Sequence, residues 1–299
     1  MNGFRHEWLS LREPLDVRSR SGELAATLAE VVRPTGSPIG TIQVVDLGAG
    51  TGANLRYLAP LIGGSQAWML ADRDPTLLAA VEERMRIWAG SIRARVFEDD
   101  RKLTVSADSF ECSIRSVRVD LATELDRVAF RAPCLVTASA LLDLVSEDWL
   151  ARLARRSTDA GASVLFALSY DGRIECLPSE PEDREVRELF NQDQMGDKGF
   201  GPALGPLAAR RAVEIFEACG YRSRAEVSDW RLDHTHQALQ RELLDQWFNV
   251  AVEVAPERES EFGKWRERRL VHIEKGRSEL IVGHADVRGW PGAHGRIRP

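Results

Sequence analysis

The sequence has few cysteines, no long apolar run and no excess of basic residues. Its four cysteines are far apart among the 299 residues and form no C-x-x-C pair, so their spacing predicts neither a zinc site nor a redox motif. We expect reduced, buried thiols in a cytoplasmic protein. The formal net charge is -6, which argues against a nucleic-acid partner, since nucleic-acid binders usually carry a basic excess.

Signals for export and for membrane insertion are also lacking. Residues 1–12 carry scattered charges rather than an apolar core, so we do not interpret them as a signal peptide. No apolar run approaches the ~20 residues that a membrane-spanning helix needs. The composition, with 43% hydrophobic and 29% charged residues, is typical of a globular protein with a substantial core.

Strand-like and helix-like segments alternate through the first half of the chain. The apolar run at 42–47 predicts a strand buried on both faces. A glycine loop and a helical pattern from 54 to 61 follow it. Further strands are predicted near 67–70, 111–119, 134–142 and 162–170, with helices at 75–88 and 147–156. This alternation predicts an α/β fold with a mostly parallel sheet and helices on both faces.

The remaining segments are predicted to form a cap and two insertions. A helix is predicted at 21–32, within an N-terminal helical cap at 1–38, and the main domain is expected to span 39–290. Residues 171–206, rich in glycine, proline and acids, are interpreted as a substrate-side insertion with a helix near 182–192. Charged helices near 235–254 and 257–270 form a helical insertion at about 235–275. A helix at 208–219 and strands at 221–230 and 279–287 complete the prediction.

The chemistry is expected at the loop Asp46-Leu47-Gly48-Ala49-Gly50-Thr51-Gly52. Glycines between a strand and a helix let a ligand approach the backbone and the free N–H groups of the helix. Gly48, Gly50 and Ala53 satisfy the dinucleotide fingerprint, and Asp72 follows at the distance of a ribose-binding acid. An NAD(P)-dependent oxidoreductase is therefore one hypothesis. Asp46 argues against it, because a carboxylate there repels a pyrophosphate and favours a cationic ligand.

Several segments resemble the motifs of class I S-adenosylmethionine-dependent methyltransferases. VVDLGAGTG is similar to the first motif, and LADRDP, VDLA and TASALLDLVS resemble the ends of the following strands. The resemblance covers residues 40–170 well and extends less specifically through 208–230 and 279–287. It implies a Rossmann-like, mostly parallel, seven-stranded sheet and S-adenosylmethionine as the cofactor. Our leading hypothesis is in-line methyl transfer to an oxygen or nitrogen of a small-molecule acceptor, although no motif here identifies the acceptor.

The resemblance further implies a role for each matching position. On the methionine side, it implies that Asp46 binds the amino group of the cofactor and that Arg20, near the N-terminus, pairs with the cofactor carboxylate. Asn54 is expected to contribute to the same part of the site. The backbone of the glycine loop is expected to contact the methionine part, at Gly48, Ala49, Gly50 and Thr51. On the nucleoside side, it implies that Asp72 accepts the ribose hydroxyls, that Arg73, Asp120 and Leu121 surround the adenine, and that Ala138 and Ser139 lie beside the sulfonium.

Acceptor-side candidates follow the fourth and fifth strands. Asp143 is a candidate base or acceptor anchor, although a solvated carboxylate at the start of a helix explains it equally well. Tyr170 is a second candidate for orienting the acceptor. Lys198 and Phe200, in a loop ending Gly-Phe-Gly-Pro, are predicted to belong to a lid over the acceptor. No N-P-P-[YF] tetrapeptide, which would indicate an amide or base nitrogen, follows the fourth strand.

The last hypotheses concern metal and partners. His234 and His236 form an H-x-H pair, but no third ligand is evident, so we expect no metal site. A cofactor-binding protein without catalysis, which grips a partner through the late helices, is a third functional hypothesis. The expected partner is otherwise a small-molecule acceptor, with no nucleic acid and no membrane. Monomer and homodimer remain open.

Overall fold

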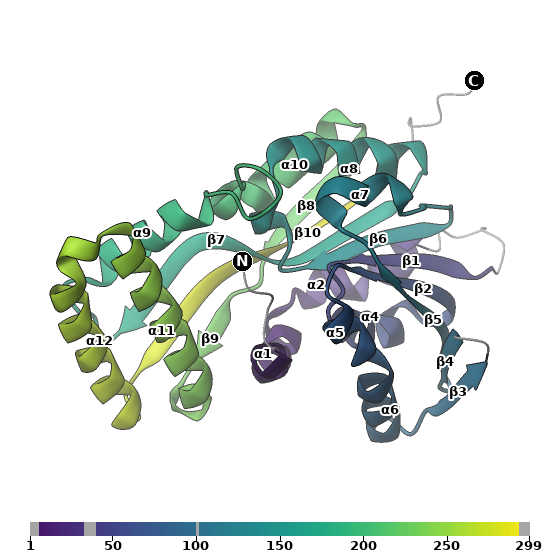
Figure 1. Cartoon of the computed structure of the whole chain (residues 1–299). Helices are drawn as coiled ribbons and strands as arrows, with labels where there is room; N and C mark the ends of the chain where they lie inside the picture. The colour runs from purple at the N-terminus through teal and green to yellow at the C-terminus, as the bar shows by residue number, and fades with distance from the viewer. Residues whose placement is uncertain (1–5, 33–39, 100–101, 293–299) are drawn as a thin grey trace.

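The computed structural model describes residues 6–32, 40–99 and 102–292 (Figure 1). It contains a ten-stranded sheet with the order β3-β4-β5-β2-β1-β6-β7-β10-β8, and β9 pairs with β10. The strands are β1 (Ile42–Leu47), β2 (Gly64–Asp72), β3 (Arg95–Asp99), β4 (Lys102–Ser106), β5 (Phe110–Arg118), β6 (Cys134–Ser139), β7 (Ser163–Leu177), β8 (Tyr221–Val227), β9 (Trp230–Leu232) and β10 (Glu279–Pro291).

The centre of the sheet is parallel, as the sequence predicted. β5, β2, β1, β6 and β7 run in one direction, whereas β10 is antiparallel to both β7 and β8. In β1, Ile42, Val44, Val45 and Leu47 are at most 1% exposed, which fits a strand covered on both faces. The fold is therefore an α/β, Rossmann-like fold. The expected seven strands are too few, because the hairpin β3–β4 and the short β9 enlarge the sheet.

Helices cover both faces of the central strands (Figure 1). One face carries α7 (Leu121–Glu124), α8 (Glu147–Asp159) and α10 (Ala208–Ala218), and the other carries α2 (Gly22–Ala26), α3 (Leu28–Val32), α4 (Ala53–Ile62), α5 (Pro75–Ala79) and α6 (Val81–Ser91). A separate apolar cluster fills each interface. This two-sided burial explains why the central strands read as nearly continuous apolar runs.

A third layer forms where β7 and β10 extend beyond their neighbours. There α1 (His6–Ser19), α9 (Asp183–Gln194), α11 (Gln237–Val254) and α12 (Glu259–Glu274) enclose another apolar cluster with β9. Figure 1 shows α9, α11 and α12 grouped at this end of the molecule. The predicted insertion at 171–206 therefore begins as a strand, because β7 continues to Leu177 and pairs with β10.

The N-terminal segment also differs from the prediction. α1 was not predicted, and the helix expected at 21–32 is two short helices, α2 and α3, separated at Thr27. The boundary at residues 38 and 39 lies outside the described residues, so the division into a cap and a main domain remains a prediction.

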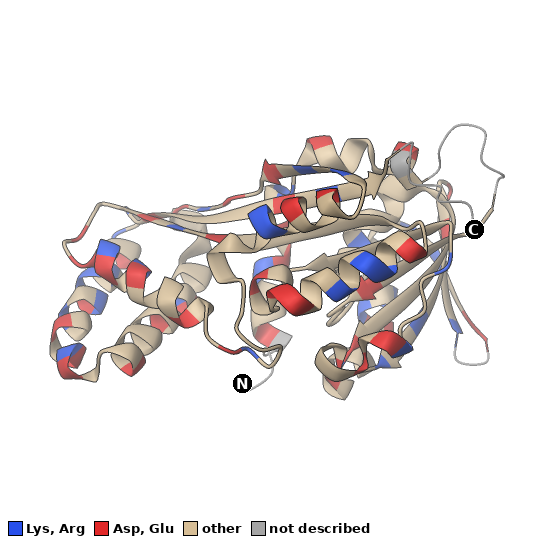
Figure 2. Cartoon of the chain, turned by 90° about the horizontal axis from the view of Figure 1, so that it is seen from above, with Lys and Arg blue, Asp and Glu red and all other residues tan. Residues whose placement is uncertain are grey.

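Acidic and basic residues are interspersed along the described helices. In the view of Figure 2, acidic and basic residues alternate along the helices rather than forming separate faces. None of the helices within 6–32, 40–99 and 102–292 is long and apolar enough to cross a membrane.

Candidate functional site

Two adjoining cavities lie at the carboxyl ends of the parallel strands, where open α/β folds bind ligands. The first, of about 100 Å³, lies against the loop after β1 and reaches the end of β2. The second, of about 130 Å³, extends to the ends of β5 and β6. Both are lined by Gly48, Asp72, Leu77, Ser139 and Ala140, so they form one elongated site.

The glycine loop is shaped by left-handed backbone conformations. Gly48, Gly50 and Gly52 have φ values of 67°, 53° and 79°, which glycine adopts without steric cost. A Cβ at Gly52 would also lie 2.5 Å from the Cε atom of Met85. The backbone N–H of Gly50 donates to Oδ2 of Asp72 over 2.8 Å. The loop is therefore held against the end of β2.

Asp46 is a buried carboxylate on the wall of the first cavity. Its Oδ1 accepts a 2.7 Å hydrogen bond from Nδ2 of Asn54, whereas its Oδ2 is buried without a hydrogen-bond partner in the described chain. Burial raises the pKa of Asp46 to about 7, against the lowering effects of Asn54 and Arg20. A buried carboxylate with a free oxygen is costly unless a donor or cation binds it, so this position fits a positively charged ligand group.

Arg20 lies behind the cavity wall rather than on it. Its Nη1 donates to Oδ1 of Asn54 over 2.6 Å and its Nη2 to Oγ of Ser139 over 3.1 Å. The guanidinium also stacks over Tyr57, 4.5 Å from the ring centroid. Burial lowers the pKa of Arg20. Its bonds therefore orient two cavity-lining side chains, and its predicted pairing with a ligand carboxylate does not follow from this placement.

Arg12 is the arginine that lines the first cavity. It lies on α1, and its Nε donates to Oδ2 of Asp16 over 2.8 Å. Its guanidinium also lies 5.2 Å from the ring centroid of Trp230. The sequence analysis missed Arg12. The signal that was available is its position four residues before Asp16, because this spacing places both side chains on one face of a helix.

α1 is held over the first cavity by polar contacts of Glu13 and Asp16 with two different elements. Arg56 on α4 donates to both carboxylate oxygens of Glu13, over 2.7 and 2.8 Å, and also to the carbonyl oxygen of Thr51. On the other side, Nε1 of Trp230 donates to Oδ1 of Asp16 over 3.0 Å. α1 thus joins the glycine loop to the far end of the sheet.

The second cavity contains the other predicted nucleoside-side residues. Arg73, Asp120 and Leu121 line it, and Asp120 Oδ1 accepts the backbone N–H of Ala122 at the start of α7. Phe200 also lines this cavity, where it packs edge-on against an indole ring at 5.4 Å. The structure thus places Phe200 on the predicted adenine side rather than over the acceptor.

The remaining predicted residues divide between core and cavity. Ala138 is buried in the core beneath the sheet edge, whereas Ser139 lines both cavities. Lys198 forms a 2.7 Å ion pair with Asp193 and lies where the second cavity meets a third.

The third cavity, of about 450 Å³, is walled by aromatic side chains. It adjoins the other two at Ala140, which follows β6 in a left-handed conformation with φ of 52°. Its aromatic lining comes from α1, β7, α9, β9 and α11, namely Trp8, Tyr170, Phe190, Trp230 and Trp247. A mostly apolar cavity of this size with a few polar side chains is typical of a small-molecule site.

Three polar side chains of the third cavity bear on its chemistry. Asp143 is 8% exposed, its Oδ1 has no hydrogen-bond partner in the described chain, and burial raises its pKa to about 6. The Tyr170 hydroxyl donates to Oδ1 of Asn191 over 2.7 Å, and burial raises the Tyr170 pKa far above its usual value. His284 was missed by the sequence analysis, because a single histidine in a strand carries no recognisable spacing. Burial, followed by the charge of Arg12, lowers its pKa to about 3.

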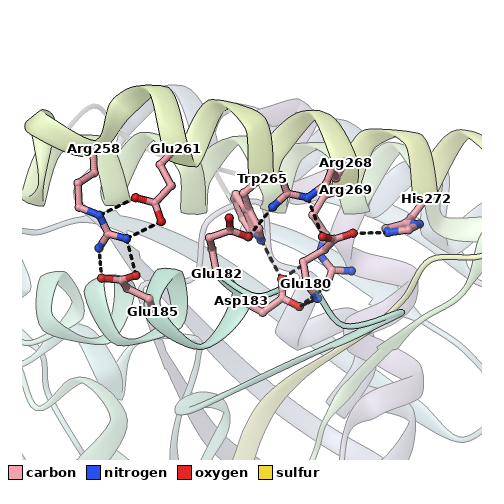
Figure 3. A network of polar contacts seen from close by, with 10 residues as sticks. All are labelled: Glu180, Glu182, Asp183, Glu185, Arg258, Glu261, Trp265, Arg268, Arg269 and His272. Carbon is pink, nitrogen blue, oxygen red and sulfur yellow. Dashed lines mark hydrogen bonds and ion pairs between the residues drawn. The ribbon is translucent and has the colours of Figure 1, made fainter.

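The helices over the third cavity are held by a partly buried ionic network (Figure 3). Asp183, at the start of α9, accepts hydrogen bonds from Nε of Arg269 over 2.9 Å and from Nε1 of Trp265 over 2.8 Å. Glu180 similarly binds Arg268 and His272. Because α11 lines the cavity and packs on α12, this network fixes one wall of the cavity.

One histidine of the H-x-H pair, His236, has a structural role. His236 Nδ1 bonds to Asp233 in the cap of a short helical turn, and its Nε2 lies 2.7 Å from Nη2 of Arg18. Within 6–32, 40–99 and 102–292, no group of three or more His, Cys, Asp or Glu side chains is placed to hold a metal ion.

No family model and no curated protein matches the sequence. Solved structures with some likeness include a cyclopropane-fatty-acyl-phospholipid synthase-like protein from Lactobacillus casei (12% identity, 96% of this chain and 94% of that chain, TM-score 0.49). Another is a SAM-dependent methyltransferase from Thiobacillus denitrificans in complex with S-adenosyl-L-homocysteine (14%, 95% and 98%, TM-score 0.42). A third is the YcgJ protein from Bacillus subtilis (12%, 90% and 98%, TM-score 0.45). At these values, the likenesses assign no activity to this chain.

Proposed function

We propose that the chain is an S-adenosylmethionine-dependent methyltransferase that acts on a small-molecule acceptor. The observation that carries this proposal is Asp46, a buried carboxylate with a free oxygen beside the glycine loop. The ammonium and sulfonium groups of S-adenosylmethionine are cationic, so this ligand supplies the charge that the position lacks. The proposal agrees with the motif resemblance along β1, β2, β5 and β6.

The cavity residues divide naturally between the two ends of this cofactor. We propose that Asp46 binds the amino group of the cofactor and that Arg12, which lines the same cavity, binds its carboxylate. Asp72 is assigned to the ribose hydroxyls, and Asp120 and Leu121 to the adenine. When bound, S-adenosylmethionine supplies an electrophilic methyl group. Ala140 stands where all three cavities meet, which is where an acceptor atom from the third cavity reaches the cofactor site.

The third cavity is the proposed acceptor site. Its size and aromatic lining favour a small organic molecule whose oxygen or nitrogen takes the methyl group. Asp143 is assigned as the group that removes the acceptor proton, because a base works best when its pKa lies near the operating pH, and its free Oδ1 has no competing partner in the described chain. Tyr170 is assigned a positioning role, since its hydroxyl is already bonded to Asn191.

The two other hypotheses have less support. The dinucleotide-binding sheet has the usual order 3-2-1-4-5-6, whereas here the antiparallel β10 separates β7 from β8. The buried charge of Asp46 would also repel a pyrophosphate on the same loop. A cofactor-binding protein without catalysis would need neither a third cavity large enough for an acceptor nor an unpaired carboxylate oxygen, that of Asp143, beside it.

Calorimetry with S-adenosylhomocysteine and with NAD tests the cofactor. We expect the wild-type protein to bind the first and not the second, and Asp46→Ala and Asp72→Ala to abolish this binding. Asp108→Asn, an exposed carboxylate remote from the cavities, is the matched control and should bind as the wild type does. NAD binding without S-adenosylhomocysteine binding would overturn the proposal.

Turnover separates an enzyme from a cofactor-binding protein. S-adenosylmethionine with an isotopically labelled methyl group is incubated with the protein and a metabolite extract, and products are identified by mass spectrometry. Label in a small metabolite, absent with Asp46→Ala, is the expected result. If cofactor binds but no labelled product forms from any extract, the catalytic part of the proposal is wrong.

A further inference from the structure

A β-bulge brings two cavity-lining side chains into register at the far end of the sheet. The pairing of β10 with β7 shifts between Val282, opposite Ile174, and His284, opposite Tyr170, so residues 171–173 of β7 bulge out opposite the single Gly283. A Cβ at Gly283 would lie 2.1 Å from Oδ1 of Asp171 and 2.7 Å from the Cβ atom of Arg173, which is held by its backbone, so a larger residue would require the strand to shift. Bulges commonly redirect a side chain beside a functional site, and here both register partners line the third cavity.

The hydrogen bonding of His284 fixes the tautomer of its ring. Nδ1 lies 2.9 Å from the carbonyl oxygen of Val282, which accepts only, so Nδ1 carries the proton and Nε2 is an acceptor. Nε2 has no hydrogen-bond partner in the described chain. The ring is clamped by Trp230 at 4.8 Å and Tyr170 at 6.2 Å between centroids. His284 therefore offers a rigid, neutral acceptor to a molecule in the cavity.

Asp143 offers a second acceptor to the same cavity. Its Oδ1 is buried without a partner in the described chain, and both side chains line the space between the aromatic walls. The two cations of this cavity are already paired, Arg12 with Asp16 over 2.8 Å and Lys198 with Asp193 over 2.7 Å. Arg12 is in addition assigned to the cofactor carboxylate, so neither cation calls for an acidic acceptor. Oδ1 of Asp143 is buried without a donor and Nε2 of His284 is an open acceptor, so both are available to the donors of a ligand, whereas flat apolar walls favour a ring.

We propose that His284, with Asp143, selects acceptors that are flat, uncharged rings bearing two hydrogen-bond donors, as in dihydroxylated aromatic compounds. One donor is the hydroxyl that takes the methyl group and gives its proton to Asp143. The other binds Nε2 of His284, which is a specificity-determining and positioning residue. This inference rests on the proposed methyltransferase function, because it assigns the third cavity to the methyl acceptor.

The probes are 2,3- and 2,7-dihydroxynaphthalene with their dimethyl ethers, which keep the ring and lose the donors. Binding to protein saturated with S-adenosylhomocysteine is followed by tryptophan fluorescence, since Trp8, Trp230 and Trp247 line the cavity. We expect at least one diol to bind roughly tenfold more tightly than its ether. If each diol and its ether bind equally, or neither binds, the proposal is overturned.

His284→Phe keeps an aromatic ring and removes the acceptor, and His234→Phe is its matched control on an exposed histidine. We expect His284→Phe to lose roughly three- to tenfold in diol affinity, with ether binding and S-adenosylhomocysteine binding unchanged, and the control to match the wild type. Unchanged diol affinity in His284→Phe refutes the role of His284. If that variant does not fold, His284→Gln, which retains an acceptor oxygen, should still prefer diol over ether. Loss of S-adenosylhomocysteine binding by the wild type would instead refute the proposed function, so the two failures are distinguishable.

Discussion

Replacing Asp46 by asparagine should stabilise the ligand-free protein while weakening its cofactor binding. Burial raises the Asp46 pKa from 3.8 to about 7, so the folded state binds more protons than the unfolded state between these values. Stability therefore falls as pH rises from about 4 to about 7. The difference of about three units corresponds to ~4 kcal/mol. Asparagine is neutral and keeps an oxygen for the bond from Asn54, so Asp46→Asn should gain up to that amount at pH 8 and nothing at pH 4.

Cofactor affinity should show the opposite dependence. If the ammonium of S-adenosylhomocysteine needs ionised Asp46, the competent fraction of the wild-type protein falls from about three quarters at pH 7.5 to about 3% at pH 5.5, roughly 25-fold. Asp46→Asn should bind weakly at both pH values, without this dependence on Asp46.

Thermal melts between pH 4 and pH 8 and calorimetry at pH 5.5 and 7.5 measure the two effects, with Asp108→Asn as the control. A variant that is less stable than the wild type at pH 8, or that retains wild-type affinity at pH 7.5, would refute the reasoning about the buried carboxylate.

Three further predictions concern other parts of the chain. Asp183→Ala leaves the buried guanidinium of Arg269 without its partner and should cost roughly 3–5 kcal/mol in chemical denaturation, whereas Glu188→Ala, at an exposed ion pair, should leave the melting temperature nearly unchanged. Asp143→Asn should lower kcat by about 10²–10⁴-fold with S-adenosylhomocysteine affinity kept, and remove the fall in rate that we expect as pH drops through about 6; an unchanged pH profile would exclude it as the base. Gly52→Ala introduces a Cβ 2.5 Å from a buried methionine side chain at a φ of 79°, and we expect a loss of about 1–3 kcal/mol in unfolding free energy. An equally stable Gly52→Ala would contradict the described loop.

The sequence predicted the centre of the fold because burial on both faces leaves a visible apolar run. β1 and β6 show this, and the glycine loop follows β1 as predicted. The hairpin β3–β4 was missed because β3 is mostly exposed and its sequence is rich in charge. α1 was missed because its packed side mixes the apolar Trp8 and Leu15 with charged residues, Glu13 bonded to α4 and Asp16 bonded to β9. Such a mixture leaves no clear apolar periodicity to recognise.

The site residues also divide into those that the sequence predicted and those that it did not. Asp46, Asp72 and Asp120 stand at or just after strand ends, which parallel topology brings to one edge, so their convergence was predictable from order alone. Arg12 and His284 reach the cavities from opposite ends of the chain, through the docking of α1 and the bulge of β7 opposite β10. Contacts of such long sequence separation depend on packing that no local pattern encodes.

The shared position of α1 has a thermodynamic consequence. Arg12 belongs to the walls of both the first and the third cavity, so a ligand that immobilises the Arg12 side chain from one cavity lowers the entropic cost of binding in the other. By linkage, this help must be equal in both directions. Occupancy of either cavity should therefore raise the affinity of the other, and a chain that lacked the first turns of α1 would lose both affinities and the cooperativity between them.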